Sequence, residues 1–374
     1  MSRASQSPSF ALELPVEGPP PPATPWTRRL GGGALQLTWR LFRPGDPGAF
    51  ALGERPAEAR FYYTANDGWR APIYPFAPPA GAHGRPVVLA HGLGGGWRSL
   101  DLDPSHSLAR VLAAAGYAVY ILEHRGDPRA LAPAGALPFS LDDVALRDLP
   151  AALDAVREHS GYERPLFLGV GLGGAALLLH LALAGDPGLA AGVLVGCPIS
   201  WPSSSAVRAA GRLATLLPPG WRIPGRRLAQ LLAPLCADGG ALGVGDVSGP
   251  VARGVLLHGA TDLHAGVLRQ LGQWAVAGAL TDQSGLIDVR SALERCAVPP
   301  MLVIAAEHDP RCTPEAGREL AASLRGEPLS LPARGALELL LGERASGHLP
   351  PAILEFLDRH AAGCAESGAL AIER

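Results

Sequence analysis

The residues best placed to do chemistry in this chain follow apolar stretches, and the central one is a glycine. The stretch Pro165–Ala176 has the pattern of a buried strand, a glycine-tight turn and an apolar helix. A turn of this kind, in the pattern Gly-x-Ser-x-Gly, lifts its middle residue above the edge of a parallel sheet, where a serine acts as a nucleophile. Here the middle residue is Gly171, which has no side chain and cannot attack a substrate.

An acid and a histidine complete the set of candidate catalytic positions. Asp309 comes just after the apolar stretch Met301–Ala306, and His348 follows Gly347 further along the chain. In nucleophilic catalysis a histidine takes the proton of the nucleophile while a carboxylate orients the imidazole. Asp309 and His348 have the side chains that these two roles need, but their spacing alone assigns neither role.

Alternating strands and helices must position these residues. A turn at Asn66–Gly68 predicts a hairpin between two short strands. Further strands are expected at 86–90, 117–122, 166–170, 192–195, 301–306 and 329–331, with helices at 107–115, 140–159, 172–184 and 351–360. Strands that alternate with helices predict right-handed crossovers, and hence an α/β fold with a mostly parallel, doubly wound sheet.

The alternation lapses in the middle of the chain, which suggests an inserted region. Residues 198–298 are expected to be irregular, with a helical stretch at 206–235 that proline and glycine interrupt. We interpret them as a helical cap, inserted after the sixth strand over the carboxyl edge of the sheet. The expected division is a Pro-rich, partly disordered segment at 1–58, a core in two parts at 59–197 and 299–374, and the cap between them.

In order and spacing, these pieces resemble the α/β-hydrolase family, in particular its capped lipase- and esterase-like members. The resemblance covers the chain from about Phe61 to His360. Its pieces are the glycine-rich turn and four further segments: His91-Gly92-Leu93, Glu123-His124-Arg125-Gly126, Ala306–Pro310 and Gly335–Ala345.

The resemblance implies a site in which two catalytic positions are empty. Asp309 maps to the acid, and Gly335–Gly342 resembles the family segment Gly-His-x-Asp-Leu-x-x-Gly, which places Ala336 at the histidine position; we prefer this alignment to His348. The oxyanion hole uses backbone N–H groups, expected here from Leu93 and Leu172. The resemblance therefore implies an esterase or lipase descendant that is catalytically impaired and retains an apolar pocket for a ligand or partner.

Three alternatives stay open. Gly169, Gly171 and Gly174 also satisfy the dinucleotide fingerprint Gly-x-Gly-x-x-Gly, but no carboxylate follows the next strand to hold a ribose. The chain could instead hydrolyse carboxylic esters or lipids through an unconventional site, with Cys197, Cys312 or Ser346 as a displaced nucleophile. The third alternative is a non-catalytic binding protein.

The expected cap carries leucines interleaved with arginines. This pattern could line an acyl pocket, rest on anionic lipid or contact a partner. The simpler interpretation, which we prefer, is that the leucines pack on the core while the arginines face solvent. The leucines and tryptophan are Leu213, Leu216, Leu217, Trp221, Leu228, Leu231 and Leu232.

Composition sets the remaining expectations. The net charge of −2 gives no global field for nucleic acid. The five cysteines lie far apart without a Cys-x-x-Cys pair, so we expect no disulfide framework, no metal and no cofactor, and a cytoplasmic location. We also expect no signal peptide and no transmembrane segment.

Overall fold

A single twisted sheet organises the molecule. The computed structural model describes residues 60–92, 94–197, 199–200, 204–233, 246–309, 312–342 and 349–363. Within these residues, eight strands form one sheet in the order β1-β2-β6-β3-β7-β8-β11-β12. The strands are β1 (Phe61–Thr64), β2 (Arg70–Phe76), β3 (Pro86–Ala90), β6 (Ala118–Leu122), β7 (Leu166–Val170), β8 (Ala191–Val195), β11 (Met301–Ala306) and β12 (Glu327–Leu331).

The sheet is antiparallel at one edge and parallel elsewhere. Strands β1 and β2 form the predicted hairpin, with Thr64 opposite Arg70, and β2 pairs antiparallel with β6. All later neighbours pair in parallel. Strands β3, β7 and β8 are buried at every residue, which explains their uninterrupted apolar sequences.

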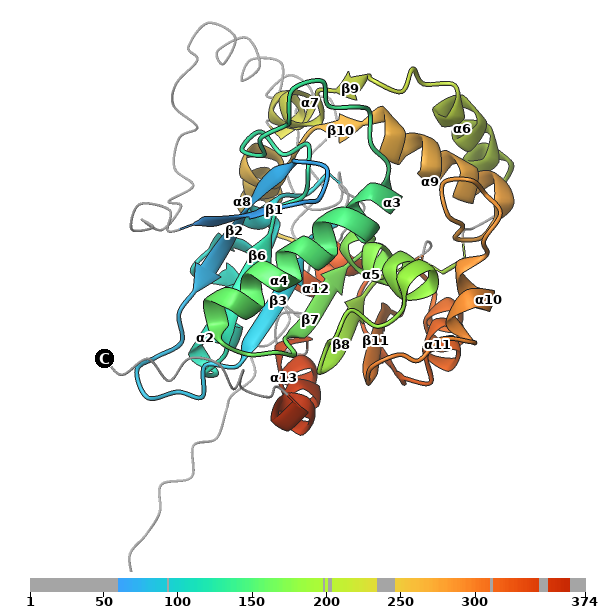
Figure 1. Ribbon diagram of the computed structural model, residues 1–374. Coiled ribbons are helices and arrows are strands. Elements are labelled where there is room, and N and C mark those ends of the chain that lie inside the picture. Colours follow the sequence, from blue (N-terminus) through green and yellow to red (C-terminus); the bar gives the residue numbers. More distant parts are fainter. Residues whose placement is uncertain are drawn as a thin grey trace, which may run out of the picture.

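Helices cover both faces of the sheet, which confirms the predicted doubly wound α/β fold (Figure 1). One face packs against α3 (Leu141–Asp143), η2 (Val144–Asp148), α4 (Leu149–Ser160), α5 (Leu172–Ala184), α10 (Val289–Leu293) and α11 (Pro314–Leu324). The other packs against α2 (Leu108–Ala114), α12 (Ala336–Leu341) and α13 (Leu349–His360). Ser140 and Asp143 form a capping box at α3.

The chain between β8 and β11, here called the β8–β11 segment, is more helical than the sequence suggested. It holds α6 (Ser205–Thr215), α7 (Gly225–Leu232), α8 (Gly249–Gly254), η5 (Val255–Gly259), α9 (Ala265–Ala277), α10 and the short pair β9 (Arg222–Ile223) and β10 (Leu263–His264). Figure 1 shows α6, α7, α9, β9 and β10 together at one end of the sheet. No described helix is long and apolar enough to cross a membrane.

The prediction of an irregular chain was wrong for α9, because its glycines are close-approach sites rather than helix breakers. A Cβ at Gly266 would lie 1.9 Å from the carbonyl oxygen of Phe139. A Cβ at Gly272 would lie 2.6 Å from the carbonyl oxygen of Gly211 in α6. Tertiary packing therefore selects glycine here against its poor helix propensity. The sequence reading also missed α11 and the ribbon of β4 (Asp101–Asp103) with β5 (His106–Ser107).

Candidate functional site

Gly171 occupies a backbone conformation that disfavours any residue with a side chain. It separates β7 from α5 with φ 51° and ψ −114°, and its N–H donates to the carbonyl oxygen of Val195 at 2.9 Å. Holding a residue that bears a Cβ at such angles costs about 1–3 kcal/mol. Glycine avoids that cost, as expected for the sharp turn that the sequence indicated.

The glycines on either side of Gly171 are required for a different reason, which is close contact with neighbouring backbone. A Cβ at Gly169 would lie 2.5 Å from the Cα of Gly174, and one at Gly173 would lie 2.4 Å from the carbonyl oxygen of Ala90. A Cβ at Gly171 would meet nothing nearer than the Cα of Gly92, at 3.8 Å. The flanking positions therefore exclude side chains by contact, whereas the middle position has room for one.

The structure brings Asp309 and Ala336 to the same edge of the sheet as Gly171. Asp309 is buried after β11, and its Oδ1 accepts the N–H of Cys312 at 3.3 Å. Ala336 opens α12, and its Cβ lies 2.6 Å from the place where a Cβ at Gly196 would stand. Because Gly171 contacts Val195 and Ala336 contacts Gly196, both positions flank the end of β8. His348 and Leu93 lie outside the described residues.

Two buried cysteines link Asp309 to the glycine turn. The Cys312 thiol donates to the carbonyl oxygen of Cys197 at 3.2 Å, and Cys197 Sγ lies 3.6 Å from the carbonyl oxygen of Gly169. Burial and the Asp309 charge raise the pKa of Cys312 to about 12, and burial raises the pKa of Cys197 well above its ordinary value. Since the thiolate is the nucleophile, neither cysteine is poised for attack.

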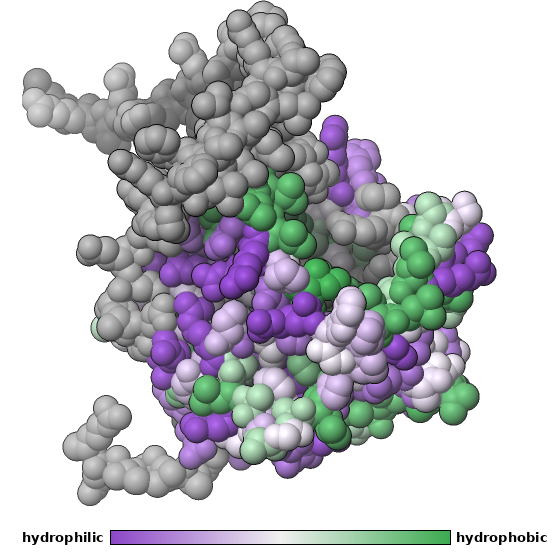
Figure 2. All heavy atoms as spheres, turned by 90° about the horizontal axis from the view of Figure 1, so that it is seen from above, coloured by the Kyte–Doolittle hydropathy of each residue, from purple (hydrophilic) through white to green (hydrophobic). Residues whose placement is uncertain are grey.

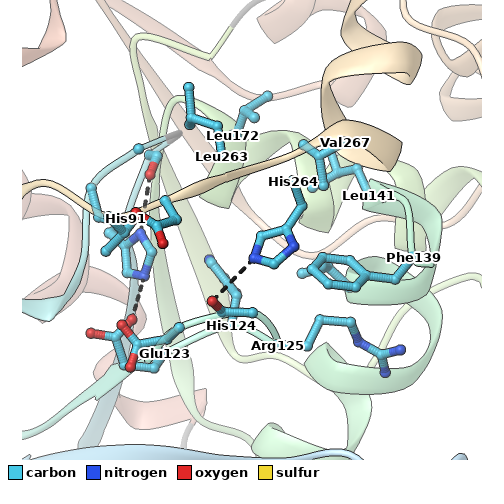
Figure 3. A pocket seen from close by; sticks show the side chains of 18 residues that line it. His91, Glu123, His124, Arg125, Phe139, Leu141, Leu172, Leu263, His264 and Val267 are labelled. Carbon is cyan, nitrogen blue, oxygen red and sulfur yellow. Dashed lines mark hydrogen bonds and ion pairs between the residues drawn. The ribbon is translucent and has the colours of Figure 1, made fainter. Parts of the chain in front are cut away.

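A cavity of about 80 Å³ lies beside the glycine turn, between the sheet edge and the β8–β11 segment (Figure 3). It has room for a few water molecules or a small organic group. Leu172, the first residue of α5, lines it, and an N–H at that position has no partner within the helix. The other apolar lining residues are Phe139, Leu141, Val144, Leu263 and Val267.

A buried histidine–glutamate pair forms one wall of the cavity. His91 Nε2 lies 3.0 Å from Glu123 Oε2, and His91 Nδ1 lies 3.0 Å from the carbonyl oxygen of Gly92. Glu123 Oε1 also accepts the N–H of Trp97. Burial alone would lower the pKa of His91, but the Glu123 carboxylate and the Gly92 carbonyl raise it above the ordinary value. Both ring nitrogens face acceptors, which favours the protonated imidazole.

The surroundings shift the pKa values of the neighbouring titratable groups. Burial and the nearby His91 charge lower the pKa of His124 to about 3, so its imidazole is neutral at physiological pH. Burial and the Glu123 charge raise the pKa of Asp127 to about 6. His264 comes from the β8–β11 segment, and its ring packs against that of Phe139 with the centroids 4.7 Å apart. Its Nε2 lies 3.1 Å from the carbonyl oxygen of Gly126.

The sequence did not assign a role to these cavity residues. His91 and Glu123–Gly126 were noted only as pieces of a resemblance, and Asp127 and Phe139 were not singled out. Their signal is positional: His91 follows β3 directly, and Glu123 follows β6 directly. The carboxyl ends of neighbouring parallel strands meet at one edge, which brings such residues together.

The Gly-x-Gly-x-x-Gly fingerprint is the candidate cofactor site that the sequence offers. Gly169 and Gly174 are explained by contacts within the chain, because a Cβ at Gly174 would lie 2.0 Å from Cys197 Sγ. The fingerprint Gly-x-Gly-x-x-Gly therefore needs no dinucleotide to account for it. Among the residues that the structure describes, no three histidine, cysteine, aspartate or glutamate side chains form a group that could hold a metal ion.

The order of the sheet and the geometry of its central turn define an α/β-hydrolase fold. Residues 85–221 match the family model described as alpha/beta hydrolase fold. Two solved structures share the fold: a hydrolase from Pseudomonas aeruginosa (22% identity, TM-score 0.56, 81% of this chain and 99% of that chain) and the enol-lactonase from Burkholderia xenovorans LB400 (17% identity, TM-score 0.53, 80% of this chain and 100% of that chain).

A curated relative matches a shorter stretch. Lipase member K of Homo sapiens is 31% identical over 140 residues, which are 34% of this chain and 35% of that protein. The match therefore spans about a third of that relative. The comparisons relate this chain to esterases and lipases by fold.

Proposed function

We propose that this chain is a catalytically impaired descendant of an ester or lipid hydrolase that retains ligand binding at the carboxyl edge of its sheet. The observation that carries the proposal is Gly171. Its backbone has the strained conformation of a sharp strand-to-helix turn, and the space beside it would accept a side chain, yet no nucleophile is present.

The missing base is the second support. At Ala336 a methyl group packs against Gly196, where the resemblance places an imidazole. Asp309 remains as a buried acid beside these positions, but a carboxylate that orients a histidine has no role in acyl transfer without that histidine.

The cavity supplies the binding part of the proposal. Its apolar side, with Phe139 and Leu263, suits a short acyl group. Its polar side offers the neutral imidazole of His124, and the start of α5 offers the N–H of Leu172 to an oxygen of the ligand. We also propose that the β8–β11 segment acts as a cap, since Leu263, His264 and Val267 line the cavity from above the sheet edge.

A second candidate is an active ester hydrolase that uses Asp127. A carboxylate whose pKa is about 6 is matched to general base catalysis near neutral pH. Asp127 would take a proton from a water molecule as that water attacks the ester carbonyl. It would return this proton to the alkoxide as the ester C–O bond breaks, which gives the acid and the alcohol.

The test is hydrolysis of p-nitrophenyl esters of two to eight acyl carbons by the purified protein. For an impaired enzyme we expect no turnover by the wild type or by Gly171→Ser. The double variant Gly171→Ser with Ala336→His should show slow turnover, which Asp309→Asn in that background removes.

Wild-type turnover that Asp127→Asn abolishes would support the second candidate and overturn the first. Turnover by Gly171→Ser alone, lost on His348→Ala, would overturn the assignment of the base to Ala336. Binding is measured separately by thermal shift with butyrate and hexanoate, with Leu263→Asp as the variant that should lose the shift.

A further inference from the structure

Part of the β8–β11 segment leaves large apolar side chains exposed. Thirteen such side chains are exposed among the described residues, and six of them fall within the short stretch from 213 to 232. The preferred interpretation that these leucines pack on the core is therefore wrong for most of them. We call this set the α6–α7 surface; its members are Leu213, Leu216, Trp221, Leu228, Leu231 and Leu232.

The exposure of these side chains follows from the way α6 packs against α9. Its buried residue is Gly211, which lies so close to α9 that an added Cβ would meet the carbonyl oxygen of Gly272 at 2.7 Å. Small residues therefore make the contact with the body of the molecule, and Leu213, 68% exposed, is left outside. Trp221 is 61% exposed in the connection to α7, where Ala229 is buried and Leu232 is not.

The same stretch carries only positive charge. Residues 204–233 contain five arginines and no aspartate or glutamate, in a chain whose net charge is −2. Arg222 pairs with Asp262 at 3.3 Å, while Arg212, Arg226 and Arg227 are exposed. Exposed apolar side chains flanked by arginine are the pattern of a helix that lies in the plane of a membrane surface.

We propose that the α6–α7 surface docks on an anionic lipid bilayer. Leu213, Leu216 and Trp221 would enter the boundary between headgroups and acyl chains, and the arginines would contact lipid phosphates. Figure 2, which looks onto the end of the molecule where α6 and α7 lie in Figure 1, shows hydrophobic side chains beside hydrophilic ones on this face.

Charge favours lipid over the other occupants. A second copy that met this surface through a twofold axis would bring its arginines against those of the first, which is unfavourable. Residues 1–59 of this chain carry five acidic and six basic residues, so they offer no net negative charge to complement it. Docking is independent of whether the cavity is catalytic.

The experiment is flotation of the full chain with vesicles of phosphatidylcholine alone or with 30% phosphatidylglycerol. We expect binding only to the anionic vesicles. The variant Leu213→Ser/Leu216→Ser/Trp221→Ser should lose it. The variant Arg212→Gln/Arg226→Gln/Arg227→Gln should bind about a hundredfold more weakly, because each basic residue near an anionic surface contributes roughly fivefold.

A matched control separates this surface from exposed leucines in general. Leu137→Ser with Leu286→Ser removes two side chains that are 80% and 86% exposed elsewhere, and it should float like the wild type. Brominated lipids should quench part of the tryptophan emission of the wild type, and Trp221→Phe should remove that part.

Three results would overturn the proposal. The first is that the wild type does not float with the vesicles. The second is that the wild type and the triple serine variant bind equally well. The third is that binding is the same with neutral and anionic vesicles. A dimer in size exclusion that the apolar variant dissociates would identify a second copy as the occupant instead.

Discussion

The turn at Gly171 and the α6–α7 surface depart from ordinary packing in opposite ways. At the turn, a side chain would fit but none is present. On the α6–α7 surface, large apolar side chains are exposed, and no described part of the chain covers them. The comparison shows that neither a glycine nor a leucine can be interpreted from its type alone, because contacts decide what each position requires.

The largest contrast is expected between leucines of the two regions. Leu177 in α5 is fully buried, whereas Leu216 is 75% exposed. Leu177→Ala should lower the free energy of unfolding by about 2–5 kcal/mol. Leu216→Ala should change it by less than about 0.5 kcal/mol. Urea unfolding followed by circular dichroism measures both, and a large loss in Leu216→Ala would mean that the α6–α7 surface is covered in the folded chain.

The next contrast lies within the turn itself. Gly173→Ala places a methyl group against the Ala90 carbonyl and should destabilise the fold by about 3 kcal/mol. Gly171→Ala meets only backbone strain and should cost about 1–2 kcal/mol. Equal losses for the two variants would contradict the distinction between a position closed by contact and one that is merely strained.

The third contrast concerns pH, which should act on one region and not on the other. The fold raises the pKa of Asp127 from 3.8 to about 6, so it favours the protonated carboxyl. That contribution is present below pH 4 and is lost as the pH rises through 6, which should cost the wild type at most about 3 kcal/mol. Asp127→Asn should remove this loss when unfolding is measured from pH 4 to pH 8.

The α6–α7 surface provides the control for that experiment. A guanidinium group does not titrate in the physiological pH range. Flotation with anionic vesicles should therefore be the same at pH 5.5 and pH 7.5, in the wild type and in Asp127→Asn. A binding curve that follows the Asp127 titration would show that the two regions are coupled.

The sequence predicted the sheet well because its strands carry strong local signals. Strands β3, β7 and β11 are short apolar runs bounded by turns, and each lies within one residue of its expected limits. Helix α9 was missed because Gly266 and Gly272 look like breakers until the chains they touch are known. Local pattern cannot reveal a contact that is made only in the folded molecule.

The site was predictable only in part for the same reason. Gly171, Asp309 and Ala336 could be proposed from the sequence because each follows an expected strand. The Glu123 pairing with His91 and the shifted pKa of Asp127 depend on burial, which the sequence does not record. The exposure of Leu213 depends on the close packing of Gly211 against α9, which the periodicity of the sequence does not reveal.

The loop after β3 has a consequence for the order in which the molecule is made. Gly96 donates its N–H to the carbonyl oxygen of Gly259, and Thr261 donates to the carbonyl oxygen of Gly94. These partners are separated by more than a hundred and fifty residues, so the loop beside Gly171 gains its pairing only after the β8–β11 segment has been synthesised. Such distant contacts slow folding. In a nascent chain that ends before residue 259, the sheet edge that lines the cavity would therefore be exposed to solvent, because the part of the β8–β11 segment that covers it would be missing.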